Sequence, residues 1–276
     1  MISNCLFPVA GYGTRFLPVT KSIPKEMLPV LTKPLIQFGV EEAMSAGITS
    51  MSFVTNEHKN AIQKYFEKFD ELECLIKGTS KESYLDKTNE IIDKCQFRFI
   101  EQKQMLGLGH AILTGRDLLK DTDAFAVILP DDLCVSDKCS VLGQMIAVHN
   151  QFPGSCVVAI EEVPWEEVNK YGIITGKEID NSRQIFEIDE MLEKPDVDKA
   201  PSNLAIIGRY ILTNDIFTIL EDIPPDHNGE IQITDALMEL AKTGKVLGYK
   251  FNGTRYDCGS VRGYLNANNF FAKKDL

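Results

Sequence analysis

Residues 4–18 read NCLFPVAGYGTRFLP, and this stretch decides how the rest of the chain is interpreted. Its first half, NCLFPVA, is an apolar run with the length and composition of a buried β-strand. Its second half has two glycines around a tyrosine, followed by Thr14 and Arg15. A loop that offers glycine amides, a hydroxyl and a guanidinium directly after a strand indicates that an anion binds against the backbone.

Similar apolar runs recur along the first half of the chain, with helical patterns between them. Runs rich in Val, Ile and Phe predict strands at 49–55, 97–102 and 124–130. The intervening segment 34–47 predicts a helix, with Pro34 suited to its first position and Gly47 to its end. Strands that alternate with helices in this way predict an α/β fold, with a Rossmann-like, mostly parallel central sheet flanked by helices.

The second half of the chain is richer in strand patterns, and it predicts an additional small antiparallel sheet region. A helix at 230–244 and a C-terminal helical segment at about 261–274 complete the prediction. The polar residues 77–96 predict a mobile excursion from the sheet. We expect one domain over residues 1–276, because no repeat or linker interrupts the pattern. The strand patterns of this half lie at 155–163, 171–176, 183–194, 203–212 and 245–251.

Composition excludes several classes of function. The formal net charge of the 276 residues is −11, which argues against general nucleic-acid binding but not against a phosphorylated small molecule. The seven cysteines form no CxxC pair, and several lie in apolar runs, so we expect reduced thiols. The sequence has neither a leader pattern nor an apolar stretch of membrane-spanning length, so it predicts a cytoplasmic protein without membrane contact.

The glycine loop fits neither of two common phosphate-binding motifs. A dinucleotide fingerprint needs a third glycine where this chain has Phe16, which argues against a nicotinamide-dependent oxidoreductase, and a P-loop needs a Gly-Lys-Ser/Thr ending. Alone, the two glycines fit a plain tight turn equally well. However, Arg15, Lys21 and Lys25 follow within one irregular, proline-rich segment, which is too long for an ordinary connector. This favours a preordered shell around a polyphosphate.

Polar side chains follow other predicted strands at the sheet edge where ligands of α/β proteins bind. Asp131 and Asp132 follow the run 124–130, Glu193 and Lys194 follow a later strand, and Asp257 lies near the chain end. In isolation, an Asp pair after a strand is typical of a turn or a helix cap. Adjacent Glu193 and Lys194 would point to opposite sides of an extended chain.

The segment AGYGTRFLPVTKSIPKEMLPVLTKPLI resembles the signature of the sugar-1-phosphate nucleotidylyltransferases, GxGTRxxPxT followed by PKxMLP. GLGHAI, ILPDD, YGII, EKP, NLAIIGRYIL, EIQITDAL and RYDCG stand in the family's order, so the resemblance covers nearly the whole chain. YDCG and FLPVTKSIPKEMLP favour the bacterial uridylyltransferase branch over its thymidylyl- and guanylyltransferase relatives. The resemblance implies a Mg²⁺-dependent reaction of UTP with glucose 1-phosphate that gives UDP-glucose and pyrophosphate. It also implies a homodimer or homotetramer.

The resemblance also assigns roles to individual residues. It implies that cations hold the phosphates, that two carboxylates hold Mg²⁺, and that a glutamine amide reads uracil, whose N–H lies between two carbonyl groups. His110 lies at a predicted helix start and is interpreted as structural. A non-catalytic sensor on the same scaffold would most simply have lost one of these charged groups, yet all are present. The implied residues are Arg15, Lys25 and Lys194 (catalytic), Ala10, Gly11, Gly13, Thr14, Glu26, Gln102 and Gly107 (nucleotide), Gly172, Glu193 and Lys194 (sugar), and Asp131 and Asp257 (metal).

Overall fold

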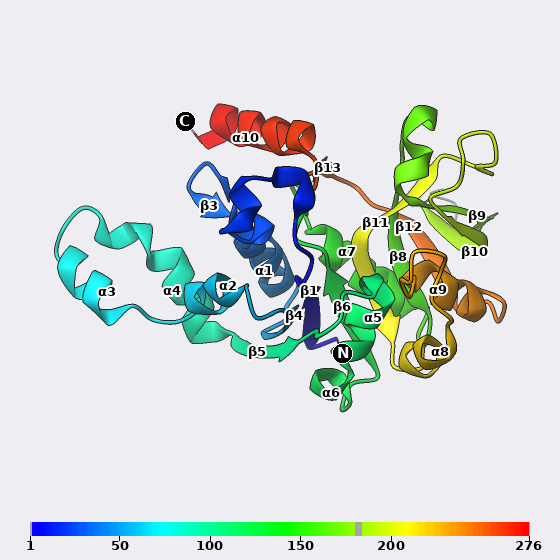
Figure 1. Ribbon diagram of the computed structural model, residues 1–276, viewed down its shortest axis with the longest axis horizontal. Helices are drawn as coiled ribbons and strands as arrows, with labels where there is room; N and C mark the ends of the chain where they lie inside the picture. Colours follow the sequence, from blue (N-terminus) through cyan, green and yellow to red (C-terminus); the bar gives the residue numbers. More distant parts are fainter. Residues whose placement is uncertain (1, 180–183, 276) are drawn as a thin grey trace.

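The computed structural model describes residues 2–179 and 184–275. A nine-stranded sheet of order β5-β4-β1-β6-β11-β8-β12-β10-β9 forms its centre (Figure 1). The predicted strands are present, although residue 183 of one prediction lies outside the described residues. The strands of this sheet are β1 Asn4–Pro8, β4 Ser50–Thr55, β5 Gln96–Glu101, β6 Ala124–Ile128, β8 Cys156–Glu162, β9 Gly172–Glu178, β10 Ile185–Glu193, β11 Leu204–Thr213 and β12 Val246–Lys250. Two short sheets pair β7 Asp132–Val135 with β13 Thr254–Asp257, and β2 Pro29–Val30 with β3 Lys33–Pro34.

The central sheet is mixed, which corrects the prediction of a mostly parallel, Rossmann-like sheet. β5, β4, β1 and β6 are parallel to one another, as the strand–helix alternation predicts. β11 then runs antiparallel to both β6 and β8. β10 is antiparallel to β12 and β9, and β9 also pairs with β11, so the last five strands close into a small barrel-like unit. β12 is parallel to β8, and α8 and α9 lie between these two strands in the chain, whereas the successive strands β9 and β10 pair antiparallel.

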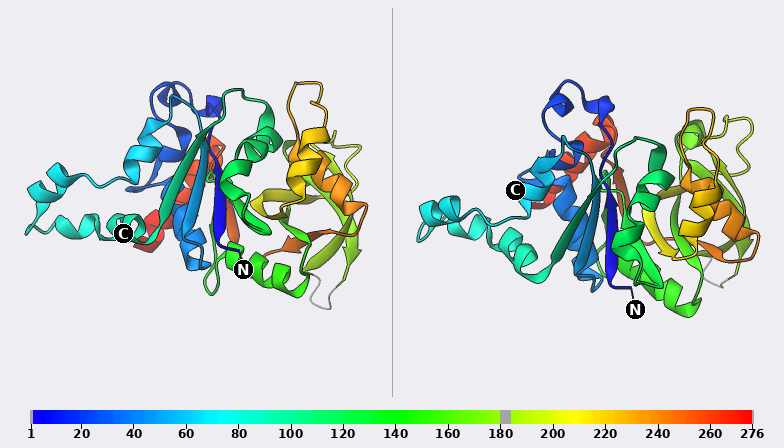
Figure 2. Two further views of the ribbon diagram at one scale, coloured as in Figure 1. Left: turned by 90° about the horizontal axis from the view of Figure 1, so that it is seen from below. Right: turned by 60° about the horizontal axis from the view of Figure 1, so that its bottom comes forward.

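Helices cover both faces of the sheet, as the two views of Figure 2 show. α1 and α7 pack on one face with residues such as Ile36 and Leu142, and α5, α8 and α9 pack on the other with residues such as Ile112 and Leu237. α1 begins one residue after Pro34, which is extended, and ends just before Gly47, whose φ is 86°. The helices are α1 Leu35–Ser45, α2 Asn60–Tyr65, α3 Asp70–Ile76, α4 Asp86–Lys94, α5 Gly107–Thr114, α6 Arg116–Leu119, α7 Val141–Gln151, α8 Ile216–Asp222, α9 Ile233–Ala241 and α10 Val261–Asp275.

The predicted excursion at 77–96 is present, but it is largely helical. α3 and α4 form an arm that extends from the side of the sheet (Figure 1, cyan). All seven cysteines are free thiols. Within the described residues, no helix has the length and apolar character needed to span a membrane.

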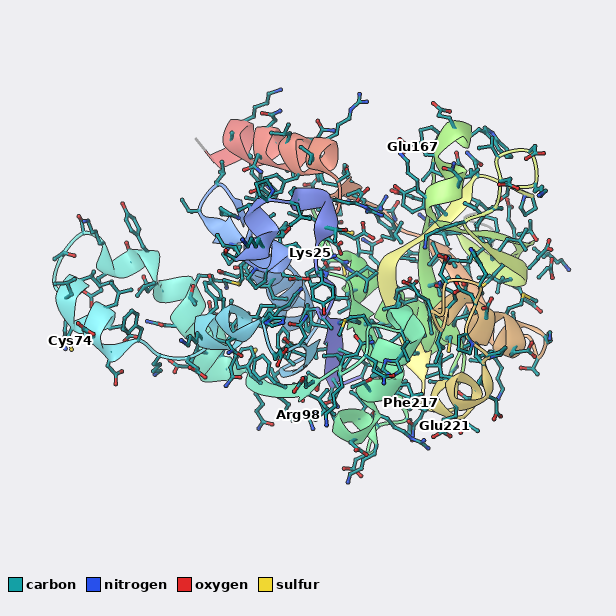
Figure 3. The ribbon with its side chains drawn as sticks, in the orientation of Figure 1. Lys25, Cys74, Arg98, Glu167, Phe217 and Glu221 are labelled. Carbon is teal, nitrogen blue, oxygen red and sulfur yellow. The ribbon has the colours of Figure 1, made fainter. Side chains whose placement is uncertain are left out.

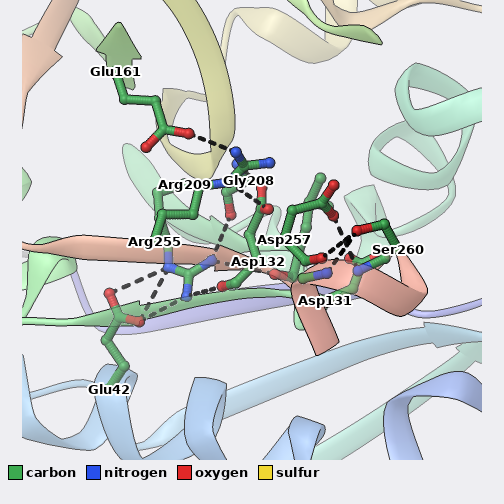
Figure 4. A network of polar contacts seen from close by, with 12 residues as sticks. Glu42, Asp131, Asp132, Glu161, Gly208, Arg209, Arg255, Asp257 and Ser260 are labelled. Atoms are coloured by element: carbon green, nitrogen blue, oxygen red, sulfur yellow. Dashed lines mark hydrogen bonds and ion pairs between the residues drawn. The ribbon is translucent and has the colours of Figure 1, made fainter. Parts of the chain in front are cut away.

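A buried ion pair fixes the turn between β6 and β7, where Asp131 lies. Arg209 on β11 is 1% exposed and donates to both carboxylate oxygens of Glu42 on α1, at 2.8–3.2 Å. The same guanidinium donates to the carbonyl oxygens of Leu129 and Asp132, at 3.2 and 2.7 Å (Figure 4). One side chain therefore satisfies the backbone on both sides of Asp131 and ties it to a helix of the core.

Candidate active site

The glycine loop after β1 is ordered by contacts with the segment that follows it. Gly13 has a φ of 67°, and a Cβ there would lie 2.9 Å from Cβ of Lys25, so only glycine fits. Thr20 donates its hydroxyl to the carbonyl oxygen of Gly13 at 2.8 Å. Thr14 and Arg15 remain exposed at the start of the short 3₁₀ helix Thr14–Phe16. The irregular segment therefore folds back on the loop and presents its polar groups to solvent.

Lys25 points from this segment to the end of β6. Its ammonium lies 2.5 Å from Oδ2 of Asp131, and Figure 3 shows the lysine near the middle of the molecule. Burial alone would lower the pKa of Lys25, but the carboxylate of Asp131 outweighs it and raises that pKa to about 12. Burial likewise opposes ionisation of Asp131, and the neighbouring lysine nevertheless lowers its pKa. Both groups are therefore charged at neutral pH.

Asp131 and Asp257, which the resemblance paired, lie together. Oδ2 of Asp131 and Oδ1 of Asp257 are each 3.0 Å from the position that a Cβ on Gly259 would occupy, and Nη1 of Arg15 is 3.5 Å from it. The strand pairing of β7 with β13 and a 2.7 Å hydrogen bond from the Cys258 amide to the Asp131 carbonyl hold the two turns side by side. Burial, and then the charges of Asp132 and Asp131, raise the pKa of Asp257.

Asp132 has a structural role that distinguishes it from Asp131. Its carboxylate accepts from the Gly208 amide at 2.6 Å and from Nε of Arg255 at 2.6 Å (Figure 4). Arg255 also donates to Glu161 at 2.5 Å and lies 4.9 Å from the ring centre of Tyr171. The sequence reasoning missed Arg255, although it lies in the quoted motif RYDCG. The available signal was an arginine within a strand that ends at a predicted site residue, Asp257.

The predicted sugar-side residues lie at the ends of β9 and β10. Gly172 pairs with Glu193, and a Cβ on the glycine would lie 2.8 Å from Cγ2 of Thr234 and 3.3 Å from Oε2 of Glu193. Lys194 has a φ of 45°, and its ammonium lies 2.9 Å from Oε1 of Glu193. The expectation that these two side chains point to opposite sides is therefore wrong, because the backbone turns left-handed at Lys194.

A single cavity of about 1000 Å³ joins the phosphate-side and sugar-side residues. Its lining includes six of the predicted residues: Arg15, Asp131, Gly172, Glu193, Lys194 and Asp257. It also includes Lys170, Arg255 and Arg262, which the sequence reasoning did not select. A smaller hollow of about 510 Å³ lies between α1 and the arm, and its lining contains none of the predicted site residues.

The predicted nucleotide-side residues Gln102 and Gly107 lie together where α5 begins, outside the lining of this cavity but next to Leu108, which is part of it. Gln102 is 4% exposed, and its amide nitrogen contacts the carbonyl oxygen of Gly107 at 3.4 Å. The Ala10 carbonyl oxygen accepts from the side chain of Asn56 at 2.5 Å, and a Cβ on Gly11 would meet nothing within 4 Å.

Glu26 is the predicted nucleotide-side residue that lies deepest. It is 1% exposed, and both of its carboxylate oxygens accept from the ammonium of Lys59, at 2.9 and 2.7 Å. Glu26 directly follows Lys25, so this buried ion pair fixes the backbone from which Lys25 extends. Lys59 gave no signal in the sequence, because it lies in a polar stretch at the start of α2.

The family model described as nucleotidyl transferase matches residues 9–274. The chain belongs to the nucleotidyl transferase family. A UTP–glucose-1-phosphate uridylyltransferase of Pseudomonas aeruginosa is 56% identical to it, over 98% of this chain and 96% of that protein. A uridylyltransferase of the same description from Staphylococcus epidermidis is 40% identical, over 99% of this chain and 93% of that protein.

Solved structures agree with this membership of the nucleotidyl transferase family. An apo UDP-glucose pyrophosphorylase matches with a TM-score of 0.95 at 55% identity, covering 100% of both chains. A UDP-glucose pyrophosphorylase complexed with UDP-glucose matches with a TM-score of 0.90 at 52% identity, covering 99% of this chain and 100% of the other. A UTP-bound enzyme of Acinetobacter baumannii matches with a TM-score of 0.90 at 38% identity, covering 99% of this chain and 94% of the other. The resemblance drawn from the sequence motifs is confirmed.

Proposed function

We propose that this protein transfers the uridylyl group of UTP to glucose 1-phosphate, giving UDP-glucose and pyrophosphate. The observation that carries the proposal is the cavity in which Arg15 and Asp131 face Glu193 and Lys194, in a chain 56% identical to a uridylyltransferase over nearly its whole length. Such a cavity has cationic groups for two phosphates and a carboxylate for sugar hydroxyls.

The reaction needs charge neutralisation more than a base. A phosphate oxygen of glucose 1-phosphate attacks the α-phosphorus of UTP and forms a new P–O bond. The bond between the α-phosphorus and the oxygen that it shares with the β-phosphorus breaks. Pyrophosphate leaves with the electron pair. The attacking oxygen is already an anion, and two unit charges about 5 Å apart repel by roughly 3 kcal/mol at an effective dielectric near 20. In this proposal Arg15 and Lys25 hold the triphosphate and Lys194 holds the sugar phosphate.

We infer that Mg²⁺ is the cofactor and that Asp131 and Asp257 hold it. The fit rests on Oδ2 of Asp131 and Oδ1 of Asp257, which lie close to each other because each is 3.0 Å from the position of a Cβ on Gly259, and on Asp257, which forms no ion pair among the described residues. In the part of the chain that is described, no group of three or more His, Cys, Asp or Glu side chains is arranged to hold a metal ion by itself, so water and phosphate oxygens would supply the other ligands. When bound, Mg²⁺ would draw charge from the phosphate oxygens.

A nucleotide panel tests the proposed function. The protein is incubated with glucose 1-phosphate, Mg²⁺ and, separately, UTP, dTTP, GTP, CTP or ATP, and the released pyrophosphate and the sugar nucleotide are measured. We expect the highest kcat/KM with UTP. A higher kcat/KM with dTTP or GTP would assign the chain to the thymidylyl- or guanylyltransferase branch instead.

Replacing Gly172 by alanine is expected to raise the KM for glucose 1-phosphate about 10-fold and to leave the KM for UTP unchanged. The added methyl group would lie 2.8 Å from Thr234 and would crowd Glu193 where the hexose is proposed to bind. Gly248→Ala is the matched control, because its methyl group would lie 3.1 Å from the side chain of Ile174, among isoleucines of the core. Equal effects of both variants on the KM for glucose 1-phosphate would contradict the sugar-side assignment of Gly172.

Assembly and location remain predictions from the family resemblance. We propose a homodimer or homotetramer, and α10 has exposed apolar side chains, Val261 and Leu265, that are available for such a contact. Light scattering measures the assembly directly. We also propose a cytoplasmic location.

A further inference from the structure

The contacts of the Gln102 amide favour one orientation. Its nitrogen lies 3.4 Å from the carbonyl oxygen of Gly107 and 2.8 Å from Nδ1 of His110, both in the first turn of α5. The carbonyl oxygen of Gly107 can only accept a hydrogen bond. A rotated amide would bring two carbonyl oxygens within 3.4 Å of each other, so the Gln102 nitrogen faces α5. That contact is long, so the 2.8 Å contact with His110 supplies most of the hold on the amide.

This orientation fixes the state of the histidine ring. Because the amide nitrogen of Gln102 donates, Nδ1 of His110 must carry a lone pair, and the proton of the neutral ring is on Nε2. Burial lowers the pKa of His110, which favours that neutral ring. His110 therefore acts as an acceptor that holds the amide nitrogen.

The carbonyl oxygen of Gln102 consequently faces away from α5. Among the residues that the structure describes, it has no hydrogen-bond partner. An oxygen held there accepts from the N3–H of uracil, but it repels the N3 lone pair of cytosine, which requires a donor. The same edge is present in thymine.

We propose that His110 is a positioning residue for nucleotide specificity: it fixes the Gln102 amide with its oxygen toward the base, and so selects uracil over cytosine. This rests on the proposed function, because it places the base at Gln102. The sequence reasoning interpreted His110 as structural; the structure instead links it to the one side chain selected for reading the base.

The test compares nucleotides in the variant His110→Leu. Without the acceptor, the amide can turn and donate to cytosine, so the ratio of kcat/KM for UTP to that for CTP should fall about 10- to 100-fold, mainly through KM. The ratio of UTP to dTTP should not change, because both bases present the same N3–H. His110→Gln retains an oxygen acceptor and should retain the preference for UTP. An unchanged ratio of UTP to CTP in His110→Leu overturns the proposal.

A double-mutant cycle shows whether His110 acts through Gln102. Gln102→Met should lower the ratio of UTP to CTP by itself, and adding His110→Leu should lower it no further. If His110→Leu does not fold, two other variants test the proposal. Gln102→Met must lose the preference for UTP over CTP, and His110→Gln must keep it. Any other result in that pair overturns the proposal.

His149→Leu is the matched control. His149 on α7 is also a half-buried helical histidine, and its Nδ1 contacts the carbonyl oxygen of Ser155, which lies after that helix, at 2.8 Å. Its loss should leave every nucleotide ratio unchanged, and a fall in the ratio of UTP to CTP there would overturn the proposal. Failure of the proposed function is distinguishable, because the unaltered protein would then make no UDP-glucose from UTP.

Discussion

Replacing Asp257 by asparagine is expected to lower kcat about 10²- to 10³-fold, while the melting temperature stays at or above that of the unaltered protein. The loss of turnover follows from the proposed metal site, because an amide oxygen is a weaker ligand for Mg²⁺ than a carboxylate. Pyrophosphate release under saturating substrates gives kcat, and thermal unfolding gives the melting temperature.

The effect on stability follows from the sign of the pKa shift. Burial, and then the charges of Asp132 and Asp131, raise the pKa of Asp257 in the folded protein. A carboxyl group whose pKa is raised on folding binds its proton more tightly in the folded state, so its ionisation costs stability as the pH rises through that pKa. Asparagine carries no charge at neutral pH, and its oxygen can still accept from the Gly259 amide, as Asp257 does at 3.0 Å.

Asp132→Asn is the matched control for Asp257→Asn, because Asp132 is adjacent to the other proposed metal ligand, Asp131. Its carboxylate pairs with Arg255 and accepts from the Gly208 amide, and it has no proposed metal role. We therefore expect Asp132→Asn to lower the melting temperature and to reduce kcat less than Asp257→Asn does. Near-normal turnover in Asp257→Asn would refute the metal assignment.

The strand–helix alternation was sufficient to predict the first half of the fold, but not the direction of the later strands. NLAIIGRYIL, which forms most of β11, is mainly apolar apart from Asn203 and Arg209, and such a run predicts a buried strand without its direction. β11 is antiparallel to both neighbours, and this makes the sheet mixed. The arginine within that run, Arg209, was the local sign that a polar group had to be satisfied inside the core.

The candidate site was predictable only where its motifs are continuous in the sequence. Asp131 and Asp257 are far apart along the chain, and the family resemblance paired them before the structure placed them side by side. The contact of Lys194 with Glu193 depends on a left-handed backbone at a lysine, which no local pattern signals. The contact of Gln102 with His110 depends on how α5 begins after β5.

Replacing Arg209 by methionine is expected to lower the free energy of unfolding by about 3–5 kcal/mol. The variant leaves the carboxylate of Glu42 buried without its cation, and it leaves the Leu129 and Asp132 carbonyl oxygens without their donor. Methionine fills much of the volume, so the loss reflects charge and hydrogen bonding more than a cavity. Denaturant unfolding at neutral pH measures the change.

The surface pair of Arg116 with Glu221 provides the control, because both side chains are about half exposed. Arg116→Met should cost less than about 1 kcal/mol, since exposed ion pairs gain little over hydration. Adding Glu42→Leu to Arg209→Met should recover part of the lost stability, because the double variant no longer buries a lone charge. If Arg209→Met were no more destabilising than Arg116→Met, the buried pair would not be what holds the turn at Asp131.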